Sequence, residues 1–183
     1  MDIAIALLHG TVDLFVEFLS PISPYLIKTY SIQARTIAML IASIMLMTAL
    51  SQIFFAMVLP RIKRQWFLLY GIIAFVVLPT SLFSLKMNIV GLYLVFFLIF
   101  LANAAYHPFG TALANRNQSS KTVTSFVSGG IIGGALGPIF ITWWVGAVGL
   151  NKIIFFNLFI FIILQPILLR VKRNFVPISK HPN

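Results

Sequence analysis

Three ionisable residues lie four positions apart in the first apolar stretch of the chain, IAIALLHGTVDLFVEFLSPISPYLI: His9, Asp13 and Glu17. Because four residues advance a helix by about 400°, side chains with this spacing project from one face. The whole chain has three acidic residues, and two of them are here. A histidine beside a carboxylate can exchange a proton near neutral pH, which is the chemistry of a proton or cation relay.

The residues around these three predict that they lie in a lipid bilayer. About 20 mostly apolar residues suffice to cross one, and residues 3–27 exceed that length. A charge at the bilayer centre costs at least about 2.5–3.5 kcal/mol, so these side chains need a polar cavity or partners. The functional interpretation is a relay that faces such a cavity. The structural alternative is a satisfied set, in which His9 bonds Asp13 while Glu17 reaches toward one membrane surface.

The composition predicts an all-α polytopic membrane protein. The 183 residues are 60% hydrophobic and 9% charged, whereas soluble domains carry about 25% charge. The net charge of +10 resides mainly in short loops, so we expect the lipid bilayer and not nucleic acid as the partner. Cysteine is absent, which excludes disulfides and thiolate metal sites. No nucleophile elbow or zinc-protease motif is found, so we expect no enzyme, no cofactor and no metal.

Apolar runs and their breaks predict six transmembrane spans, the first of which should kink or end near Pro21 and Pro24. They form one domain, residues 1–173, followed by a short polar tail, residues 174–183. Nine lysines and arginines lie in the second, fourth and C-terminal polar segments and four in the alternate loops. The positive-inside rule therefore predicts that both termini are cytoplasmic. We expect the membrane to be a bacterial inner membrane. The spans are approximately 3–27, 36–59, 66–85, 89–113, 122–149 and 153–170.

The fifth span contains a stripe of small residues. Glycines recur every four positions with further glycines beside them, and this spacing lets another helix approach closely. We expect a helix–helix interface here, loosened by a proline that removes a backbone donor. The residues are Gly129, Gly130, Gly133, Gly134, Gly137 and Pro138.

Three further groups of polar residues stand out in the sequence. His107, before Pro108 in the fourth span, is either a contact on a cavity wall or part of a kink that reaches the headgroups. Ser51 and Gln52 in the second span are expected to bond a neighbouring helix. The basic loop after that span is expected to anchor the chain at the cytoplasmic surface; its residues are Arg61, Lys63 and Arg64.

These residues together resemble the N-terminal half of a major facilitator superfamily transporter, and most of all the fosmidomycin-resistance type. The likeness runs in order through the chain. It is carried by His9-Gly10-Thr11-Val12-Asp13 with Pro21 and Pro24, by Ser51-Gln52-Ile53-Phe54-Phe55 leading to Arg61-Ile62-Lys63-Arg64, and by Tyr106-His107-Pro108-Phe109-Gly110 with Gly129-Gly130, Gly133 and Gly137-Pro138.

The resemblance implies two inverted three-helix repeats, residues 1–87 and 88–173. It places the first and fourth helices, with His9, Asp13, Glu17 and His107, on a cavity wall. The second and fifth helices would face the other half of the transporter, and the third and sixth would lie outside. Because the family has twelve helices, a second half is needed, either a homodimer joined through the glycine stripe or another six-helix chain.

We therefore expect a half-size secondary transporter of a small organic molecule, coupled to protons and acting as a dimer. The alternative is a non-transporting subunit or assembly scaffold in a larger membrane complex. That alternative is favoured by two departures in the loop motif, where Ala56 and Pro60 stand in place of the family's glycine and aspartate.

Overall fold

The structure is a computed structural model that describes residues 2–85, 87–116, 119–173 and 175, with the side chain of Asp2 left out. All regular elements among these residues are helices, so the prediction of an all-α fold is confirmed. The elements in order are α1 (Asp2–Val16), α2 (Ser23–Tyr30), α3 (Ala34–Val58), η1 (Leu59–Arg61), α4 (Gln65–Val77), η2 (Pro79–Ser84), α5 (Ile89–Asn115), α6 (Ser120–Ala147), η3 (Leu150–Lys152) and α7 (Ile153–Arg173).

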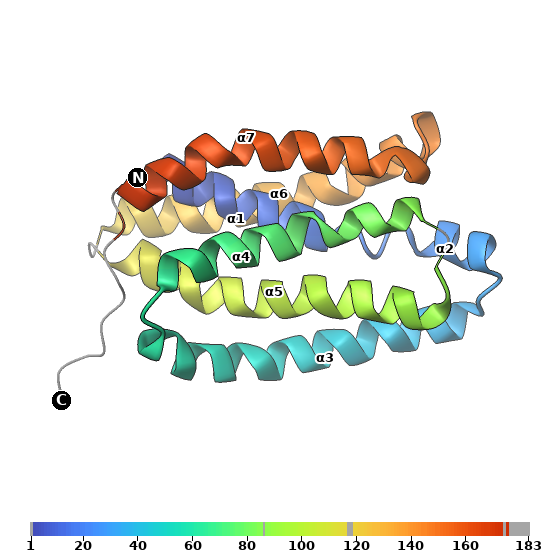
Figure 1. Cartoon of the computed structure of the whole chain (residues 1–183), viewed down its shortest axis with the longest axis horizontal. Coiled ribbons are helices and arrows are strands. Elements are labelled where there is room, and N and C mark those ends of the chain that lie inside the picture. The colour runs from blue at the N-terminus through green and yellow to red at the C-terminus, as the bar shows by residue number, and fades with distance from the viewer. Residues whose placement is uncertain (1, 86, 117–118, 174, 176–183) are drawn as a thin grey trace.

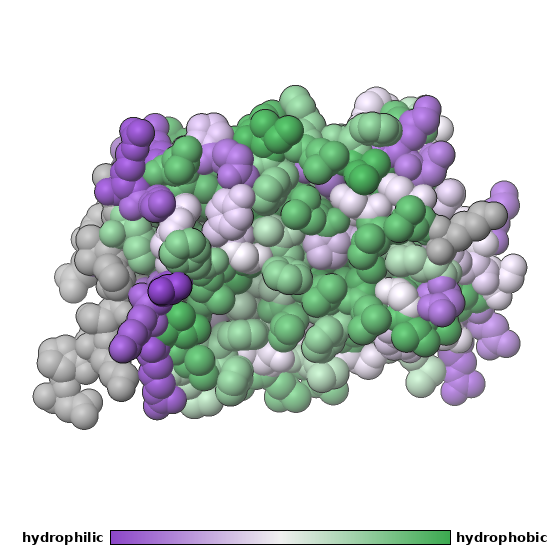
Figure 2. Space-filling model, in the orientation of Figure 1, coloured by the Kyte–Doolittle hydropathy of each residue, from purple (hydrophilic) through white to green (hydrophobic). Residues whose placement is uncertain are grey.

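The long helices lie side by side in a bundle, with the start of α1 and the end of α7 at the same end (Figure 1). An apolar band crosses the middle of the visible face, and hydrophilic residues gather at both ends (Figure 2). Five helical stretches are long and apolar enough to cross a membrane, which makes the fold compatible with a bilayer. They are Ala34–Arg61, Gln65–Ser84, Ile89–Asn115, Ser120–Ala147 and Leu150–Arg173.

The first predicted span is not one continuous helix. α1 has 15 residues and so measures about 22 Å, less than the hydrocarbon core of about 30 Å. Pro21 explains the break, because it has no N–H to offer the Glu17 carbonyl and its ring crowds that carbonyl. The chain tightens into a turn over residues 17–22, and α2 begins at Ser23 with Pro24 in its first turn.

Proline also divides the third predicted span into α4 and the 3-10 helix η2, which begins at Pro79. Asn157 of α7 is fully buried and secures η2. Its Nδ2 donates to Thr80 Oγ1 at 2.7 Å and to Ser81 Oγ at 2.9 Å. Two elements far apart in the sequence are thereby joined by polar bonds inside an apolar bundle.

The helices differ in how much of their surface the bundle covers. In the most apolar window of α5, 56% of the residues are buried, so this helix is central. The corresponding shares are 22% for α3 and α7 and 44% for α4. The resemblance placed the third and sixth spans outside. α7 fits that expectation, whereas α4 is more enclosed because it packs on α1, α5 and α7.

Candidate functional site

Two of the three residues in the first stripe meet a histidine from another helix. His9 and Asp13 lie one turn apart on α1, and His107 projects from α5. His9 Nε2 is 3.3 Å from Asp13 Oδ2, and His107 Nε2 is 3.7 Å from Asp13 Oδ1. We call these three residues the His–Asp–His cluster. His9 is buried, with 6% of its surface exposed, whereas Asp13 and His107 are partly open.

A third helix, α6, fixes the orientation of His9. The His9 Nδ1 atom lies 2.7 Å from the carbonyl oxygen of Phe126, and the two rings stack with centroids 3.9 Å apart. Because a carbonyl oxygen only accepts hydrogen bonds, the hydrogen at this contact is on Nδ1. The Nε2 atom is thus directed toward Asp13.

Two glycines create the space for this arrangement. A Cβ atom at Gly110 would lie 2.6 Å from the Phe126 ring, so the glycine lets that ring reach His9. A Cβ atom at Gly130 would lie 2.7 Å from Asp13 Oδ2 and 2.8 Å from His9 Nδ1. A larger residue at either position would displace the groups that form the cluster.

The geometry at His9 Nε2 favours a shared proton. This atom is buried and has no hydrogen-bond partner, although Asp13 Oδ2 lies 3.3 Å away. In a neutral histidine with its hydrogen on Nδ1, Nε2 is an acceptor, and a carboxylate oxygen is also an acceptor. Two acceptors repel unless a proton or another cation lies between them. The cluster is therefore suited to taking up and releasing one proton.

The same three residues are the described ones that could hold a metal ion. One donor atom from each lies within 4.8 Å of the others. Donor atoms around a tetrahedral metal ion are closer, about 3.3 Å apart for bonds of about 2.0 Å. The cluster as it stands is wider than that.

Glu17 lies beside the cluster, one turn after Asp13, and its charge acts on the Asp13 carboxylate. It follows the end of α1, is exposed, and lines a cavity between the 17–22 turn, α3 and α5. We call this the Glu17 cavity; its volume is about 440 Å³. Its polar lining residues are Glu17, Ser20, Thr48, Gln52 and Asn103. Of the three residues of the predicted stripe, His9 and Asp13 lie in the cluster, and Glu17, just beyond the end of α1, lines the neighbouring cavity.

The glycine stripe of α6 packs against α1 of the same chain. A Cβ atom at Gly129 or Gly133 would overlap the backbone of Ala6 or Gly10, and one at Gly137 would lie 2.6 Å from a carbonyl oxygen of α1. Gly133 and Gly137 are buried, and Gly134 and Pro138 are half-buried. Since α1 occupies this face, a homodimer joined through the glycine stripe is not available to this fold.

The remaining predicted residues lie as follows. His107 lies 3.7 Å from Asp13 inside the bundle, next to Pro108 in α5. Gln52 faces the Glu17 cavity, and Ser51 is half-buried. The basic loop after η1 is exposed at the end of the bundle where α1 begins; its residues are Arg61, Lys63 and Arg64.

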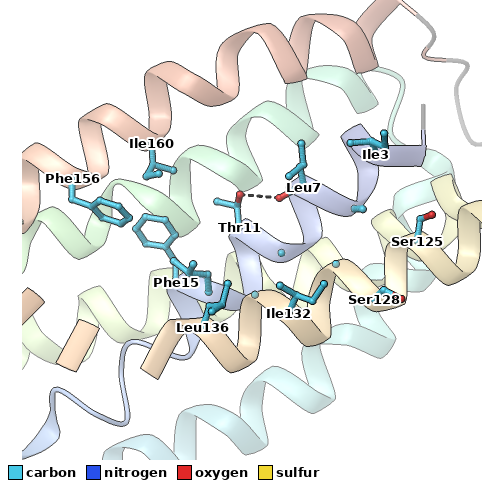
Figure 3. Close-up of a pocket in the computed structure, with 15 residues that line it drawn as sticks. Ile3, Leu7, Thr11, Phe15, Ser125, Ser128, Ile132, Leu136, Phe156 and Ile160 are labelled. Carbon is cyan, nitrogen blue, oxygen red and sulfur yellow. Dashed lines mark hydrogen bonds between the residues drawn. The ribbon is translucent and has the colours of Figure 1, made fainter. Parts of the chain in front are cut away.

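An apolar groove of about 450 Å³ lies apart from the cluster, between α1, α6 and α7 (Figure 3). Its walls include Leu7, Ile132 and Leu136, and Phe156 packs near Phe15 with ring centroids 5.9 Å apart. The hydroxyl of Thr11, one of its few polar groups, donates to the Leu7 carbonyl of its own helix at 2.8 Å. The groove thus offers apolar contact and little chemistry.

Two site residues were missed in the sequence. Phe126 supplies the carbonyl that orients His9, and the sequence holds no signal for a backbone contact between residues 117 positions apart. Asn103 lines the Glu17 cavity. Its position one helical turn before His107 could have placed it on the same face of α5.

Comparisons with family models, curated proteins and solved structures found no match to this chain.

Proposed function

We propose that this chain is a six-helix unit of a secondary transporter, similar to half of a major facilitator superfamily protein, that couples movement of a small organic molecule to protons. The observation that carries the proposal is that the Asp13 carboxylate lies between two histidines, 3.3 Å from His9 Nε2 of its own helix and 3.7 Å from His107 Nε2 of α5. Adding a proton to the cluster turns a repulsive pair of acceptors into a hydrogen bond. Losing a proton that Asp13 shares with His107 weakens the link between α1 and α5, which biases the equilibrium between conformations.

Pairing of the helices supports the proposed repeats, residues 1–87 and 88–173. α1 packs most extensively on α6, and α3 on α5. In two such repeats α1, α3 and α4 correspond to α5, α6 and α7. Exchanging each helix for its counterpart turns the α1–α6 pair into the α5–α3 pair, so the two pairs are equivalent. Inverted repeats are a recurring architecture of secondary transporters.

The proposed orientation rests on the basic residues. We place the bundle end that carries Arg61, Lys63 and Arg64 on the cytoplasmic side of a bacterial inner membrane, together with both chain termini. The start of α1 and the end of α7 lie at this same end of the bundle (Figure 1). Arg170 and Lys172, in the last turn of α7, add to its positive charge.

A second half would complete the transporter, supplied by another copy of this chain or by a second six-helix chain. With the glycine face taken by α1, the exposed apolar side of α3 is the surface we assign to it. Its exposed residues include Met39, Leu46, Leu50, Ile53 and Met57. Exposed Glu17, at membrane depth, also needs such a cover.

The test is proton movement in vesicles that contain the purified protein and the pH-sensitive dye pyranine. Fosmidomycin and ethidium serve as an anionic and a cationic probe. We expect one of them to drive proton movement with the wild type and not with Asp13→Asn, which keeps the side-chain shape. Asn115→Leu, at the far end of α5, serves as the control that retains it. Wild-type rates in Asp13→Asn would refute the role of the cluster.

The alternative function is a non-transporting subunit that helps to assemble a larger membrane complex. Ala56 and Pro60, at the altered positions of the loop motif, favour it. Native mass spectrometry of the complex isolated in mild detergent separates the two functions. One copy among unrelated chains would support the alternative, and a dimer or a pair of six-helix chains would support the transporter.

A further inference from the structure

The Glu17 cavity is a second polar site that the proton-coupling proposal does not use. It opens between the turn after α1, the middle of α3 and the middle of α5, and its volume of about 440 Å³ is within the range of small-molecule sites. Its apolar walls come mainly from Leu19, Ile41, Met45 and Phe100. A cavity with apolar walls and a few convergent polar groups is the usual form of a ligand site.

Its polar wall includes three acceptor groups, alongside the donors of Ser20, Gln52 and the Asn103 amide. Asn103 is 7% exposed, and its Oδ1 atom is buried without a hydrogen-bond partner. Thr48, also buried, uses its hydroxyl hydrogen to bond the Ile44 carbonyl at 2.8 Å, so its oxygen remains an acceptor. Glu17 adds a carboxylate. An unpartnered buried acceptor is destabilising, and a hydrogen-bond donor from a ligand would remove that cost.

The charge of the cavity is one-sided. Among the residues that the structure describes, none that lines it is a lysine, arginine or histidine. Because Glu17 is a carboxylate at membrane depth, a cation beside it would be stabilised by both charge and the low dielectric of the surroundings. Neutral donors would satisfy Asn103 but leave Glu17 without a counter-ion.

We propose that the Glu17 cavity binds a protonated primary amine. Its three N–H groups match the three kinds of acceptor, namely the Glu17 carboxylate, Asn103 Oδ1 and Thr48 Oγ1. Its carbon skeleton contacts the apolar walls. A quaternary ammonium brings the charge without any donor, so it suits the cavity less well. The inference rests on the proposed function, since it names the class of molecule that the transporter carries.

This site adjoins the His–Asp–His cluster on two helices. Glu17 follows Asp13 by four residues, with its backbone N–H bonded to the Asp13 carbonyl at 3.0 Å, and Asn103 precedes His107 by four residues on α5. Residues four apart on a helix are neighbours on its surface. Occupation of the cavity therefore bears on the same two helices that the cluster joins.

The first test needs only the wild-type chain in lipid nanodiscs and three matched probes measured by calorimetry. Phenethylamine carries charge and donors, trimethyl(phenethyl)ammonium carries charge alone, and 2-phenylethanol is uncharged. We expect phenethylamine to bind about tenfold more tightly than the other two, since charge-assisted hydrogen bonds are about twice as strong as neutral ones. Equal affinity for all three, or no binding of the amine, would overturn the proposal.

Variants then locate the site. Glu17→Gln and Asn103→Leu are expected to weaken phenethylamine binding about tenfold and about fivefold, because each removes an acceptor. Asn115→Leu makes the same substitution at the end of α5, away from the cavity, and should bind as the wild type does. Unchanged affinity in Glu17→Gln would overturn the assignment.

The two proposals fail separately. Amine binding without proton movement in vesicles would support the amine site and refute the proposed transport function. Proton movement driven by fosmidomycin, with no binding of phenethylamine, would support the proposed transport function and refute the amine site.

Discussion

Replacing Gly133 by alanine should strongly destabilise the bundle, because this glycine is where α6 and α1 approach most closely. A Cβ atom there would overlap the Gly10 carbonyl oxygen and lie 2.6 Å from the Gly10 Cα. Backbone atoms cannot swing aside as a side-chain tip can, so the helices must move apart. Overpacking of this kind costs about 1–3 kcal/mol. For a protein of this size that corresponds to a melting temperature lower by about 2–12 °C.

The neighbouring residue supplies the control. A Cβ atom at Gly134 meets only Glu17 Cγ, at 3.9 Å, which is ordinary van der Waals contact. Gly134→Ala should therefore be neutral or more stable by about 0.5–1 kcal/mol, because alanine restricts the unfolded chain and favours the helix. Thermal unfolding of both variants and the wild type in one detergent, followed by circular dichroism, decides the matter. If Gly133→Ala melts at or above the temperature of Gly134→Ala, the packing of α6 on α1 described above is wrong.

Three further predictions concern the cluster, the bundle and the orientation. Gly130→Ala should lower proton-coupled flux in vesicles about tenfold or more, because the new Cβ atom meets side chains of the His–Asp–His cluster. It should lower the melting temperature less than Gly133→Ala does. Wild-type flux in this variant would contradict the position of Gly130 beside the cluster. Asn157→Ala should lower the free energy of unfolding by about 0.6–1.7 kcal/mol, because it removes hydrogen bonds between α7 and η2. Gln165→Ala, whose hydrogen bond stays within α7, should lower it by about 0–0.5 kcal/mol. Equal losses in thermal unfolding would refute the link between α7 and η2. The chain has no cysteine, so Asn115→Cys and Asn151→Cys each introduce a single thiol. An impermeant maleimide added to intact cells should label only the second, and the reverse result would invert the proposed orientation.

Local signals in the sequence reached part of the site. His9 and Asp13 are four residues apart, and helical geometry alone brings them together, as their 3.3 Å contact shows. Pro21 and Pro24 predicted an interruption of the first span, and an interruption occurs there. The interruption begins one turn before Pro21, because proline has no N–H to donate to the carbonyl four residues earlier.

Contacts between helices could not be read from the spacing. Phe126 reaches His9 from α6 because Gly110 leaves room for its ring, and this depends on where α5 and α6 cross. The glycine stripe predicted a close helix partner but not which one, because any helix can exploit the absence of Cβ atoms. α1 of the same chain takes that place.

By itself the sequence determined the all-α class, the apolar stretches and the one-turn pairing of His9 with Asp13, because all three follow from composition and from the geometry of a single helix. The tertiary structure alone decided that His107 completes the cluster and that Glu17, beside it, lines a cavity with Asn103. It also decided that the glycines of α6 pack against α1 of the same chain. The physical reason is that helix crossings depend on the summed fit of many side chains, and each of these contacts joins residues that spacing along one helix cannot relate.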